Sequence, residues 1–270
     1  MDYRKIRQAL IWTLLSLLVF QESYAQATSE KNKPPVYVLV HGAWHGGWCW
    51  QQVSAILRGS GAVVYTPTLS GQGEHKNVIT ADINLETHIS DIVNLIEMED
   101  LHDVILVGHS YAGAVIGGVA DRIPGRLRKL VFLDPVLVKS GQSVLSAINA
   151  PAITAEVTQS AAMNGGLTIP AWPVPIYGVK DSANTRWMRP RLTGQPFRTF
   201  TQQLTLQHPY GNHLPLIFIA CTAEINPAFA HFAKSAKNNK DWEYHELVTG
   251  HDAMILVPKE TAALLETFAD

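Results

Sequence analysis

The segment G-H-S-Y-A, residues 108–112, carries the arrangement in this sequence that is best suited to nucleophilic chemistry. A serine hydroxyl attacks a carbonyl when it lies exposed at the end of a strand with a base in reach. A sharp strand-to-helix turn exposes it in this way but strains its backbone, so the residues two before and two after must be small. Gly108 and Ala112 meet that requirement around Ser110. The alternative is a structural serine whose hydroxyl caps the following helix.

His251 is the residue expected to act as the base for Ser110. Where a serine occupies this kind of turn, the chain order is nucleophile, acid and then histidine. Among the eleven histidines, only His251 combines that order with a position in a short loop between the last apolar run and a final helix. His109 is adjacent to Ser110 in the turn, so its ring cannot fold back to serve that hydroxyl.

Three carboxylates are candidates for the acid that orients the histidine. Glu224, in C-T-A-E-I-N-P, follows an apolar run at the position where such an acid is expected, and it is the preferred candidate. Asp134, in F-L-D-P, follows another apolar run, although an Asp-Pro pair is also a common turn former. Asp252 would point away from the site if His251 points into it. The preference therefore depends on chain position, and all three stay open.

Two backbone N–H groups are expected to stabilise the negative charge that develops on an attacked carbonyl oxygen. One belongs to the residue after the nucleophile, Tyr111, and the other to the loop after the first apolar run, at Ala43. Gly42, Gly46 and Gly47 give that loop the freedom to turn an amide inward. Alone, the loop would be an ordinary glycine turn. Opposite a nucleophile, it predicts an oxyanion hole.

Short apolar runs alternate with amphipathic stretches along most of the chain, which predicts an α/β fold with a six-stranded, mostly parallel sheet and helices on both faces. The expected strands are 36–40, 62–65, 104–107, 130–133, 216–220 and 244–248. The expected helices are 48–58, 85–98, 112–123, 227–236 and 258–269. Because ligands of such sheets bind beyond the carboxyl ends of the strands, the residues after each strand are expected to carry the chemistry.

Residues 135–213 interrupt this alternation, because they contain no clear strand and collect prolines and aromatic residues. A structureless loop of this length is implausible in a compact domain, so the segment is expected to form a helical cap inserted over the strand ends. Five residues are candidates to line an apolar substrate pocket beneath the cap, although each could equally belong to the core of the cap: Trp44, Trp172, Tyr177, Trp187 and Met188.

The N-terminal residues have the layout of a secretory signal peptide, with three basic residues before an apolar run over 9–20 and small residues near Ala25. The run is shorter than the roughly 20 residues of a membrane span. We therefore expect residues 1–25 to be cleaved, leaving a domain over 26–270 that is exported to the periplasm or the medium without a stable membrane anchor.

The composition excludes several other classes of protein. The net charge is −2 and no basic block is present, so nothing favours binding to nucleic acid. The two cysteines, Cys49 and Cys221, are too few for a disulfide framework and are expected to be buried thiols.

Several segments, in this order and spacing, resemble the α/β-hydrolase branch that contains plant methyl-salicylate-type esterases, hydroxynitrile lyases and related bacterial esterases. They are V-L-V-H-G-A-W-H-G-G-W-C-W, P-T-L-S-G-Q-G-E-H, G-H-S-Y-A-G and T-G-H-D-A-M, and the cap segment R-L-T-G-Q-P-F-R-T-F is similar to one in the bacterial members. The resemblance implies a triad of Ser110, Glu224 and His251, an oxyanion hole from Ala43 and Tyr111, and no metal or organic cofactor. The acid of the family is commonly aspartate, so Glu224 is a departure.

The resemblance also bears on the reaction. The lyases hold cyanide with a lysine directly after the catalytic histidine, where this chain has Asp252, and with a threonine where it has Gly42. The expected reaction is therefore serine-dependent hydrolysis of a small carboxylic ester through an acyl-enzyme. The alternatives are a binding protein of the same fold without turnover, a hydroxynitrile-lyase-like enzyme, and a metal-dependent hydrolase using His41 and His45. The last has little support, because this pair lies in a glycine loop without a carboxylate partner.

Overall fold

A six-stranded sheet in which every neighbouring pair is parallel forms the centre of the fold. The computed structural model describes residues 33–223 and 229–269. The strand order is β2-β1-β3-β4-β7-β8, so the chain leaves β1 toward β2 on one side and later returns to β3 on the other. In open parallel sheets, this kind of reversal creates the crevice in which ligands bind. The strands are β1 (Val36–Val40), β2 (Val63–Tyr65), β3 (Val104–His109), β4 (Leu127–Leu133), β7 (Leu216–Cys221) and β8 (Trp242–Leu247).

The central strands are continuous apolar runs because helices cover both of their faces. All six residues of β3 and of β7 are buried, whereas the edge strand β8 reads W-E-Y-H-E-L and has no buried residue. Edge strands are commonly protected by charged side chains in this way. The fold class predicted from the sequence is confirmed, and each of the six strands lies within a few residues of its expected position.

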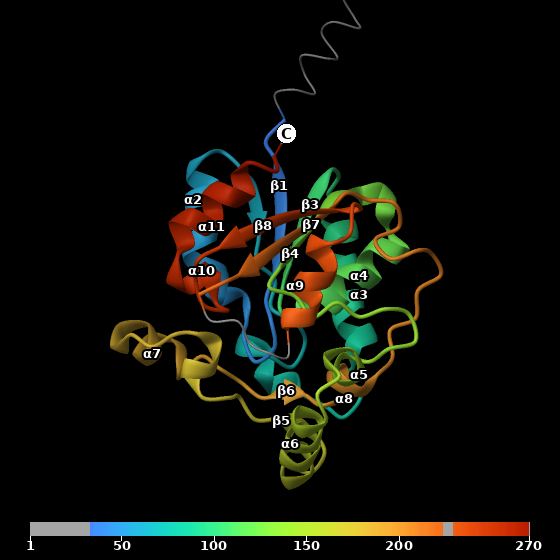
Figure 1. Cartoon of the computed structure of the whole chain (residues 1–270), viewed down its shortest axis with the longest axis vertical. Coiled ribbons are helices and arrows are strands. Elements are labelled where there is room, and N and C mark those ends of the chain that lie inside the picture. Colours follow the sequence, from blue (N-terminus) through green and yellow to red (C-terminus); the bar gives the residue numbers. More distant parts are fainter. Residues whose placement is uncertain (1–32, 224–228, 270) are drawn as a thin grey trace, which may run out of the picture. The chain divides into compact units, whose positions relative to one another are not determined.

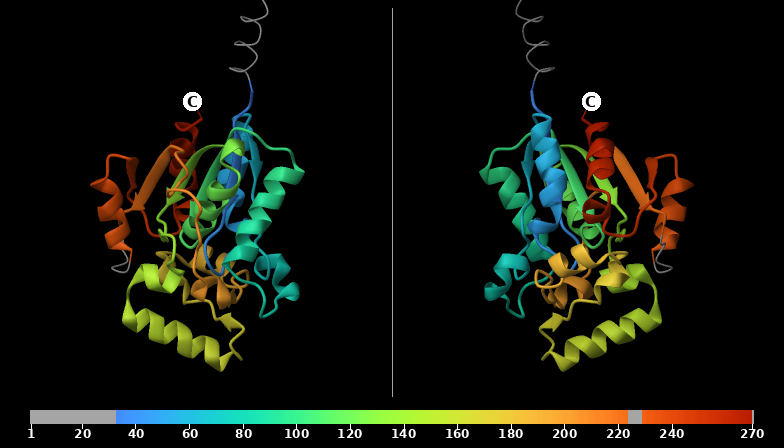
Figure 2. Two further views of the ribbon diagram at one scale, coloured as in Figure 1. Left: turned by 90° about the vertical axis from the view of Figure 1, so that its right-hand side faces the viewer. Right: turned by 90° about the vertical axis from the view of Figure 1, so that its left-hand side faces the viewer.

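Helices pack in two layers, one on each face of the sheet (Figures 1 and 2). α2 (Gln51–Gly59) and α11 (Pro258–Glu266) contact each other on one face, and α3 (Leu85–Met98) and α4 (Ala112–Arg122) contact each other on the other. The first residues of α3 are fixed by a capping box, in which Asn84 accepts from the Thr87 amide and the Thr87 hydroxyl accepts from the Asn84 amide. The remaining helices outside the cap are α9 (Ala230–Lys237), α10 (Ala253–Leu256), and the 3-10 turns η1 (Gly47–Trp50), η2 (Gly73–Val78) and η3 (Pro124–Arg126).

The helix that follows Ser110 lies deep in the molecule. Every residue of α4 from 112 to 120 is buried, so the helix has no polar face over this stretch. Its first turn approaches the segment after β4 so closely that a Cβ on Gly113 would lie 2.6 Å from the carbonyl oxygen of Val136. The glycine at this position therefore serves close packing of the helix.

Seven short elements lie between β4 and β7 and gather at one end of the sheet (Figure 1). Two of them, β5 and β6, pair as a two-residue antiparallel ladder, which was not predicted, because one of its four residues is proline. The rest are helical, as expected for this segment. The seven are α5 (Val144–Ile148), α6 (Pro151–Met163), β5 (Thr168–Ile169), η4 (Val174–Tyr177), α7 (Ser182–Met188), β6 (Gln195–Pro196) and α8 (Arg198–Thr201).

Some expectations concern residues outside the described ranges. The signal peptide expected over residues 1–25 lies there and stays a prediction. Over the described residues, no helix is both long and apolar enough to cross a membrane. Cys49 and Cys221 are both buried and unpaired, which confirms the expectation for them.

Replacing Gly113 with alanine is expected to destabilise the protein by about 1–3 kcal/mol, because the new methyl group meets backbone that cannot move aside. Gly125 is the matched control, since a Cβ there meets nothing within 4 Å. Chemical denaturation of Gly113→Ala and Gly125→Ala measures the difference. Equal stability of the two variants would contradict the close approach of α4 to the segment after β4.

Candidate active site

Ser110 occupies a strained turn between β3 and α4. Its φ of 54° lies in the left-handed region, which residues other than glycine rarely adopt. A Cβ on Gly108 would lie 2.8 Å from the carbonyl oxygen of Ala112, so the residues two before and two after the serine crowd each other as the sequence predicted. The strained conformation is held by backbone bonds, because the Ser110 carbonyl accepts from the amides of Gly113 and Val136.

His251 lies between β8 and α10, and its ring is held by an aspartate that follows β4. The distance from His251 Nδ1 to Asp134 Oδ2 is 2.6 Å. The second carboxylate oxygen of Asp134 accepts a hydrogen bond of 3.3 Å from the Cys221 amide, which fixes the direction of the carboxylate. Asp134 itself has a φ of 42°, another left-handed conformation at the site.

The structure thus brings the second of the three candidate acids to the histidine. Glu224, the preferred candidate, lies outside the described residues. Among the described residues, the side chain of Asp252, the third candidate, is hydrogen-bonded to His45 rather than to the ring of its neighbour His251, with 3.0 Å between Asp252 Oδ2 and His45 Nε2.

Asp134 also sets the protonation of the histidine. Although burial alone would lower it, the hydrogen bond and the negative charge of Asp134 raise the pKa of His251. Since Nδ1 faces a carboxylate, that nitrogen carries a proton, and Nε2 is left to exchange one.

Ser110 and His251 line the same pocket, although they lie 141 residues apart in the chain. Within the described residues, the serine hydroxyl forms no hydrogen bond with the ring. Such bonds are often long in unliganded enzymes and shorten in the complex with substrate. The structure therefore brings the predicted nucleophile and the predicted base to one cavity, with a carboxylate bound to the far side of the histidine ring.

The loop after β1 presents the other predicted groups. The amides of Ala43 and Tyr111 have no hydrogen-bond partner within the described part of the chain, and both residues line the pocket beside Ser110. Gly42 lies against the nucleophile, because a Cβ there would be 3.0 Å from Ser110 Cβ and 2.8 Å from His109 Nδ1. Two free amides beside the serine match the geometry of an oxyanion hole.

His41 orients the peptide group that carries the Ala43 amide. Its Nε2 accepts a hydrogen bond of 3.0 Å from the Leu69 amide, so its single proton is on Nδ1, which donates to the Gly42 carbonyl at 2.8 Å. Burial lowers the pKa of His41 to about 3, so the ring stays neutral. Because a carbonyl and the next amide share one rigid plane, holding the Gly42 oxygen aims the Ala43 N–H.

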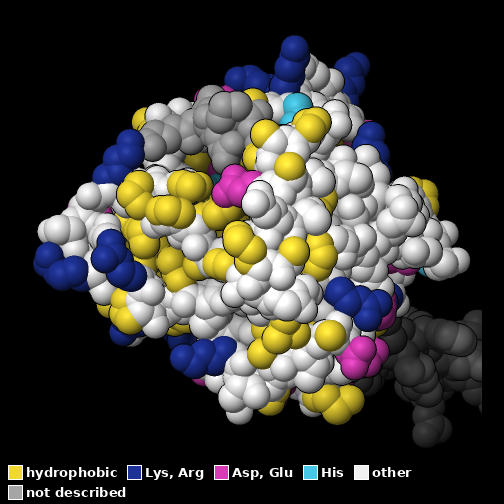
Figure 3. Space-filling view, turned by 90° about the horizontal axis from the view of Figure 1, so that it is seen from below, with side chains coloured by type: hydrophobic (Ala, Val, Ile, Leu, Met, Phe, Trp, Pro, Cys, Tyr) yellow, Lys and Arg dark blue, Asp and Glu magenta, His cyan; other side chains and the backbone are white. Residues whose placement is uncertain are grey.

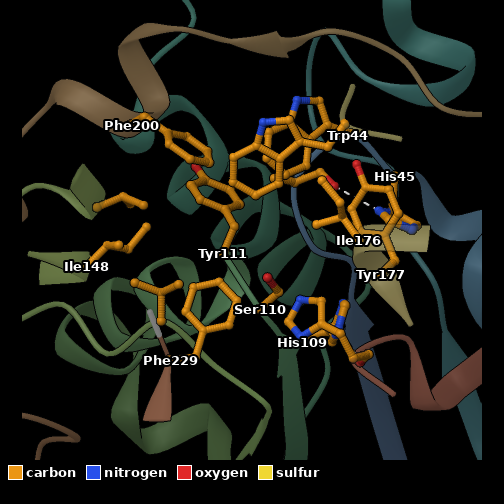
Figure 4. A pocket seen from close by; sticks show the side chains of 15 residues that line it. Trp44, His45, His109, Ser110, Tyr111, Ile148, Ile176, Tyr177, Phe200 and Phe229 are labelled. Carbon is orange, nitrogen blue, oxygen red and sulfur yellow. Dashed lines mark hydrogen bonds between the residues drawn. The ribbon is translucent and has the colours of Figure 1, made fainter. Parts of the chain in front are cut away.

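The pocket is walled by aromatic and aliphatic side chains from the loop after β1 and from the cap (Figure 4). Trp44, whose φ is 64°, packs against several other residues of this wall. Its ring centroid lies 4.5 Å from that of Trp172 and 5.8 Å from that of Phe200, and its indole N–H donates to the Ile169 carbonyl. Tyr111 stacks on Phe200 at 5.6 Å. The lining residues not anticipated from the sequence are His45, His109, Val136, Val144, Ile148, Ile176, Phe200 and Phe229.

Three of the five predicted pocket residues line the cavity beside Ser110, and two do not. Trp44, Trp172 and Tyr177 line the pocket. Trp187 and Met188 do not. The ring of Trp187 packs edge-on against Trp48 outside the pocket, and Met188 is fully buried. Sequence alone could not separate cap core from pocket wall, because both are apolar.

Gln195, in the cap segment R-L-T-G-Q-P-F-R-T-F, is a further residue that sequence reasoning missed. It is fully buried, and its side-chain oxygen accepts a 3.0 Å hydrogen bond from the Trp44 amide. The cap also contacts the histidine loop, because the Asp252 amide donates to the Tyr177 carbonyl and a Cβ on Gly178 would lie 2.7 Å from Gly250 Cα. The cap is thus bound to both loops that carry functional groups.

The metal-site alternative is not supported by the positions of its two histidines. Both ring nitrogens of His41 are hydrogen-bonded to backbone. Those of His45 meet the Ala43 carbonyl and the Asp252 carboxylate. Neither ring has a nitrogen left to bind an ion.

Comparisons with known proteins agree with this fold. The Alpha/beta hydrolase family matches residues 37–264. The carbendazim hydrolyzing esterase of Nocardioides sp. (strain SG-4G) is 38% identical over 238 residues, which cover 85% of this chain and 97% of that protein. Putative methylesterase 11 of Arabidopsis thaliana is 34% identical over 110 residues, which cover 40% of this chain and 28% of that protein.

A solved structure is similar over nearly the whole chain. It is an extracellular α/β-hydrolase from a Paenibacillus species, described as sharing structural and functional homology with tobacco Salicylic Acid Binding Protein 2. Its TM-score is 0.76 at 25% identity, and the match covers 87% of this chain and 98% of that one. The chain therefore belongs to the α/β-hydrolase family. Within it, the relatives are those of the esterase branch that the sequence motifs predicted.

The hydrogen bond from His251 makes a direct prediction for Asp134→Asn. Removing the negative charge is expected to lower the pKa of His251, since Asp134 raises it in the native protein. NMR titration of the His251 ring measures the change, and Glu224→Gln is the matched control, expected to leave the titration unaltered. A drop in the pKa of His251 in the Glu224 variant, without one in the Asp134 variant, would transfer the role to Glu224.

Proposed function

We propose that this carboxylic ester hydrolase cleaves small uncharged esters with Ser110 as the nucleophile, through an acyl-enzyme. One observation carries the proposal: a serine in a strained turn shares a pocket with a histidine whose Nδ1 is bound by a carboxylate. Nucleophile, base and orienting acid are the three groups that acyl transfer needs, and they are recognised by such roles rather than by sequence position.

Asp134 is proposed as the orienting acid in place of Glu224. A histidine Nδ1 carries one proton and directs it to one strong acceptor. At 2.6 Å, Asp134 already takes that place, and the Cys221 amide holds its carboxylate in position. In the sequence, chain position favoured Glu224 as the acid, and Asp134 was the competing candidate.

The proposed reaction proceeds in two halves. His251 Nε2 takes the proton of Ser110 as the serine oxygen bonds to the ester carbonyl carbon. The resulting oxyanion accepts hydrogen bonds from the amides of Ala43 and Tyr111. His251 then returns the proton to the alkoxide as the bond between carbon and alcohol oxygen breaks. Water, deprotonated by His251, attacks the acyl-enzyme in the second half and releases the acid and the free serine.

The character of the pocket supports small apolar substrates. None of its lining residues is Asp, Glu, Lys or Arg. Ile176, which is 49% exposed, places an aliphatic side chain at its edge. Hydrophobic side chains also gather on the surface at this end of the molecule (Figure 3). A charged substrate group would lose its hydration here without gaining a counter-charge. By its similarity to the Nocardioides esterase, carbendazim is a sensible compound to test.

The lyase alternative has no support from the position of Asp252. The residue after the histidine would have to present a cation to the pocket, whereas here it is an acid that faces His45 and is fully buried. Hydrolysis therefore remains the proposed reaction.

Replacing Ser110 with alanine is expected to lower kcat/KM for a chromogenic aryl ester by at least about 10³-fold, because the acyl-enzyme can no longer form. Ser54→Ala is the matched control. Ser54 is also a buried serine, but it lies on α2 and its hydroxyl donates to the Gln51 carbonyl. The measurement is turnover of an ester panel by both variants at equal folded concentration. Undiminished turnover by Ser110→Ala would exclude a serine mechanism.

Esters that carry a carboxylate on the acyl group are expected to react at least about 100-fold more slowly, in kcat/KM, than isosteric neutral esters, because burying a charge without a partner is costly. Esters that carry an ammonium group should be rejected to a similar degree. The matched series distinguishes an apolar wall, which rejects both charges, from electrostatic selection of one sign. Equal rates for neutral and charged members would show that the pocket residues do not contact the acyl group.

A further inference from the structure

We infer that Asp252 and His45 form a buried ion pair that holds the oxyanion loop after β1 and the histidine loop after β8 in one fixed arrangement. The two residues are 207 positions apart, and each lies next to or near a functional group: Asp252 directly follows His251, and His45 lies two residues after Ala43. The inference rests on the proposed function, since it assigns positioning roles within that site.

The pair is sealed from solvent and its contact is direct. His45 Nε2 lies 3.0 Å from Asp252 Oδ2, and the two side chains are 1% and 0% exposed. The other ring nitrogen of His45 lies 2.7 Å from the Ala43 carbonyl oxygen. The ring of Trp48 stacks on that of His45, with 5.2 Å between the centroids. Tyr177 meets the His45 ring edge-on, also at 5.2 Å (Figure 4). The ring therefore has a single orientation.

The partners of His45 require both of its nitrogens to carry protons. A carbonyl oxygen can only accept, and so can an ionised carboxylate, so Nδ1 and Nε2 must both donate. Although burial alone would raise it, the charge of His45 and the hydrogen bond from His45 lower the pKa of Asp252. The pair is thus an imidazolium and a carboxylate, whose charges cancel and leave the pocket without net charge.

On one side, the pair fixes the oxyanion loop. The peptide group that joins Ala43 to Trp44 is held at both ends, with its carbonyl bound by His45 and its N–H bound by Gln195. The preceding peptide group is held by His41 at its carbonyl. With two successive peptide planes fixed, the Ala43 amide that closes the oxyanion hole has no freedom to turn.

On the other side, the pair fixes the histidine loop. The Asp252 amide donates to the Tyr177 carbonyl at 3.1 Å, so both the backbone and the side chain of this residue are anchored. One residue earlier, the His251 carbonyl accepts from His109 Nε2 at 3.0 Å. The same His109 nitrogen lies 3.8 Å from Asp252 Oδ1. The main chain at His251 is therefore held on each side of the catalytic ring.

The ion pair gives a role to the Asp252 carboxylate, which takes no part in the proposed reaction itself. Asp252 does not line the pocket and is not bonded to the His251 ring, so it acts through other residues and is a positioning residue. A buried ion pair adds little to stability compared with apolar residues of the same size. Its role here is to fix orientation. The two hydrogen bonds of the rigid His45 ring join the oxyanion loop to the histidine loop, which the sheet does not connect directly.

The test uses Asp252→Ala, Asp252→Asn and a control in the full-length enzyme. Losing the contact lets both loops move, and misplacement by about 1 Å can reduce a rate by roughly 100-fold. We expect kcat of Asp252→Ala to fall by about that factor while KM changes less than about threefold. Asp252→Asn should recover most of kcat, because the amide can donate to a neutral His45 that still donates to Ala43.

Asp121→Ala is the matched control. Asp121 is 10% exposed, lies near the opposite end of α4 from Ser110, and accepts hydrogen bonds from the amides of Gln207 and His208. Its loss should lower the melting temperature without lowering kcat per folded molecule. If Asp252→Ala behaves in the same way, the pair is only structural and the inference is wrong.

A second measurement is independent of variant folding. NMR of the wild-type ring nitrogens should show a proton on both nitrogens of His45 in the folded enzyme, as its two acceptors require. A His45 ring with a proton on only one nitrogen would overturn the ion pair. Failure of the proposed function is a separate result, because it would appear as turnover by Ser110→Ala whatever the state of His45.

Discussion

The strained backbone of Ser110 is the constraint on which the rest of the site depends. A φ of 54° costs free energy at a residue with a side chain, and it persists only where the surrounding structure determines it. Here the Ser110 amide donates to the Leu133 carbonyl, and its own carbonyl accepts from Gly113 and Val136. Glycines at 108 and 113 are the consequence, because the same backbone approach leaves no space for a Cβ.

A second principle of this site is that histidines orient backbone as well as exchange protons. His41 holds the Gly42 carbonyl, His45 holds the Ala43 carbonyl, and His109 holds the His251 carbonyl. His251 differs because its Nδ1 faces Asp134 and its Nε2 is the nitrogen that the proposed reaction uses. Burial lowers the pKa of His41 and of His109, whereas at His251 the hydrogen bond and the negative charge of Asp134 outweigh burial and raise the pKa.

The cap contributes to the geometry of the site as well as to its walls. Gln195 binds the Trp44 amide, the Tyr177 carbonyl binds the Asp252 amide, and Gly178 lies against Gly250. A shift of the cap would therefore displace both the oxyanion loop and the histidine loop. The cap also supplies part of the aromatic lining, since Trp172 and Phe200 from the cap pack against Trp44.

The sequence by itself determined the sheet, the strained serine and the loops after β1 and β8, because these follow from local patterns: apolar runs, small residues around Ser110 and glycines after Val40. It left open which carboxylate meets His251, since several acids follow strands and only the packing of β4 beside β7 brings Asp134 Oδ2 within 2.6 Å of the ring. It also could not separate Trp172 in the pocket wall from Trp187 outside it, nor pair His45 with Asp252 across 207 residues. Hydrogen bonds between distant segments depend on side-chain orientations, and these are set only when the whole chain is folded. The order of residues along the chain does not specify them.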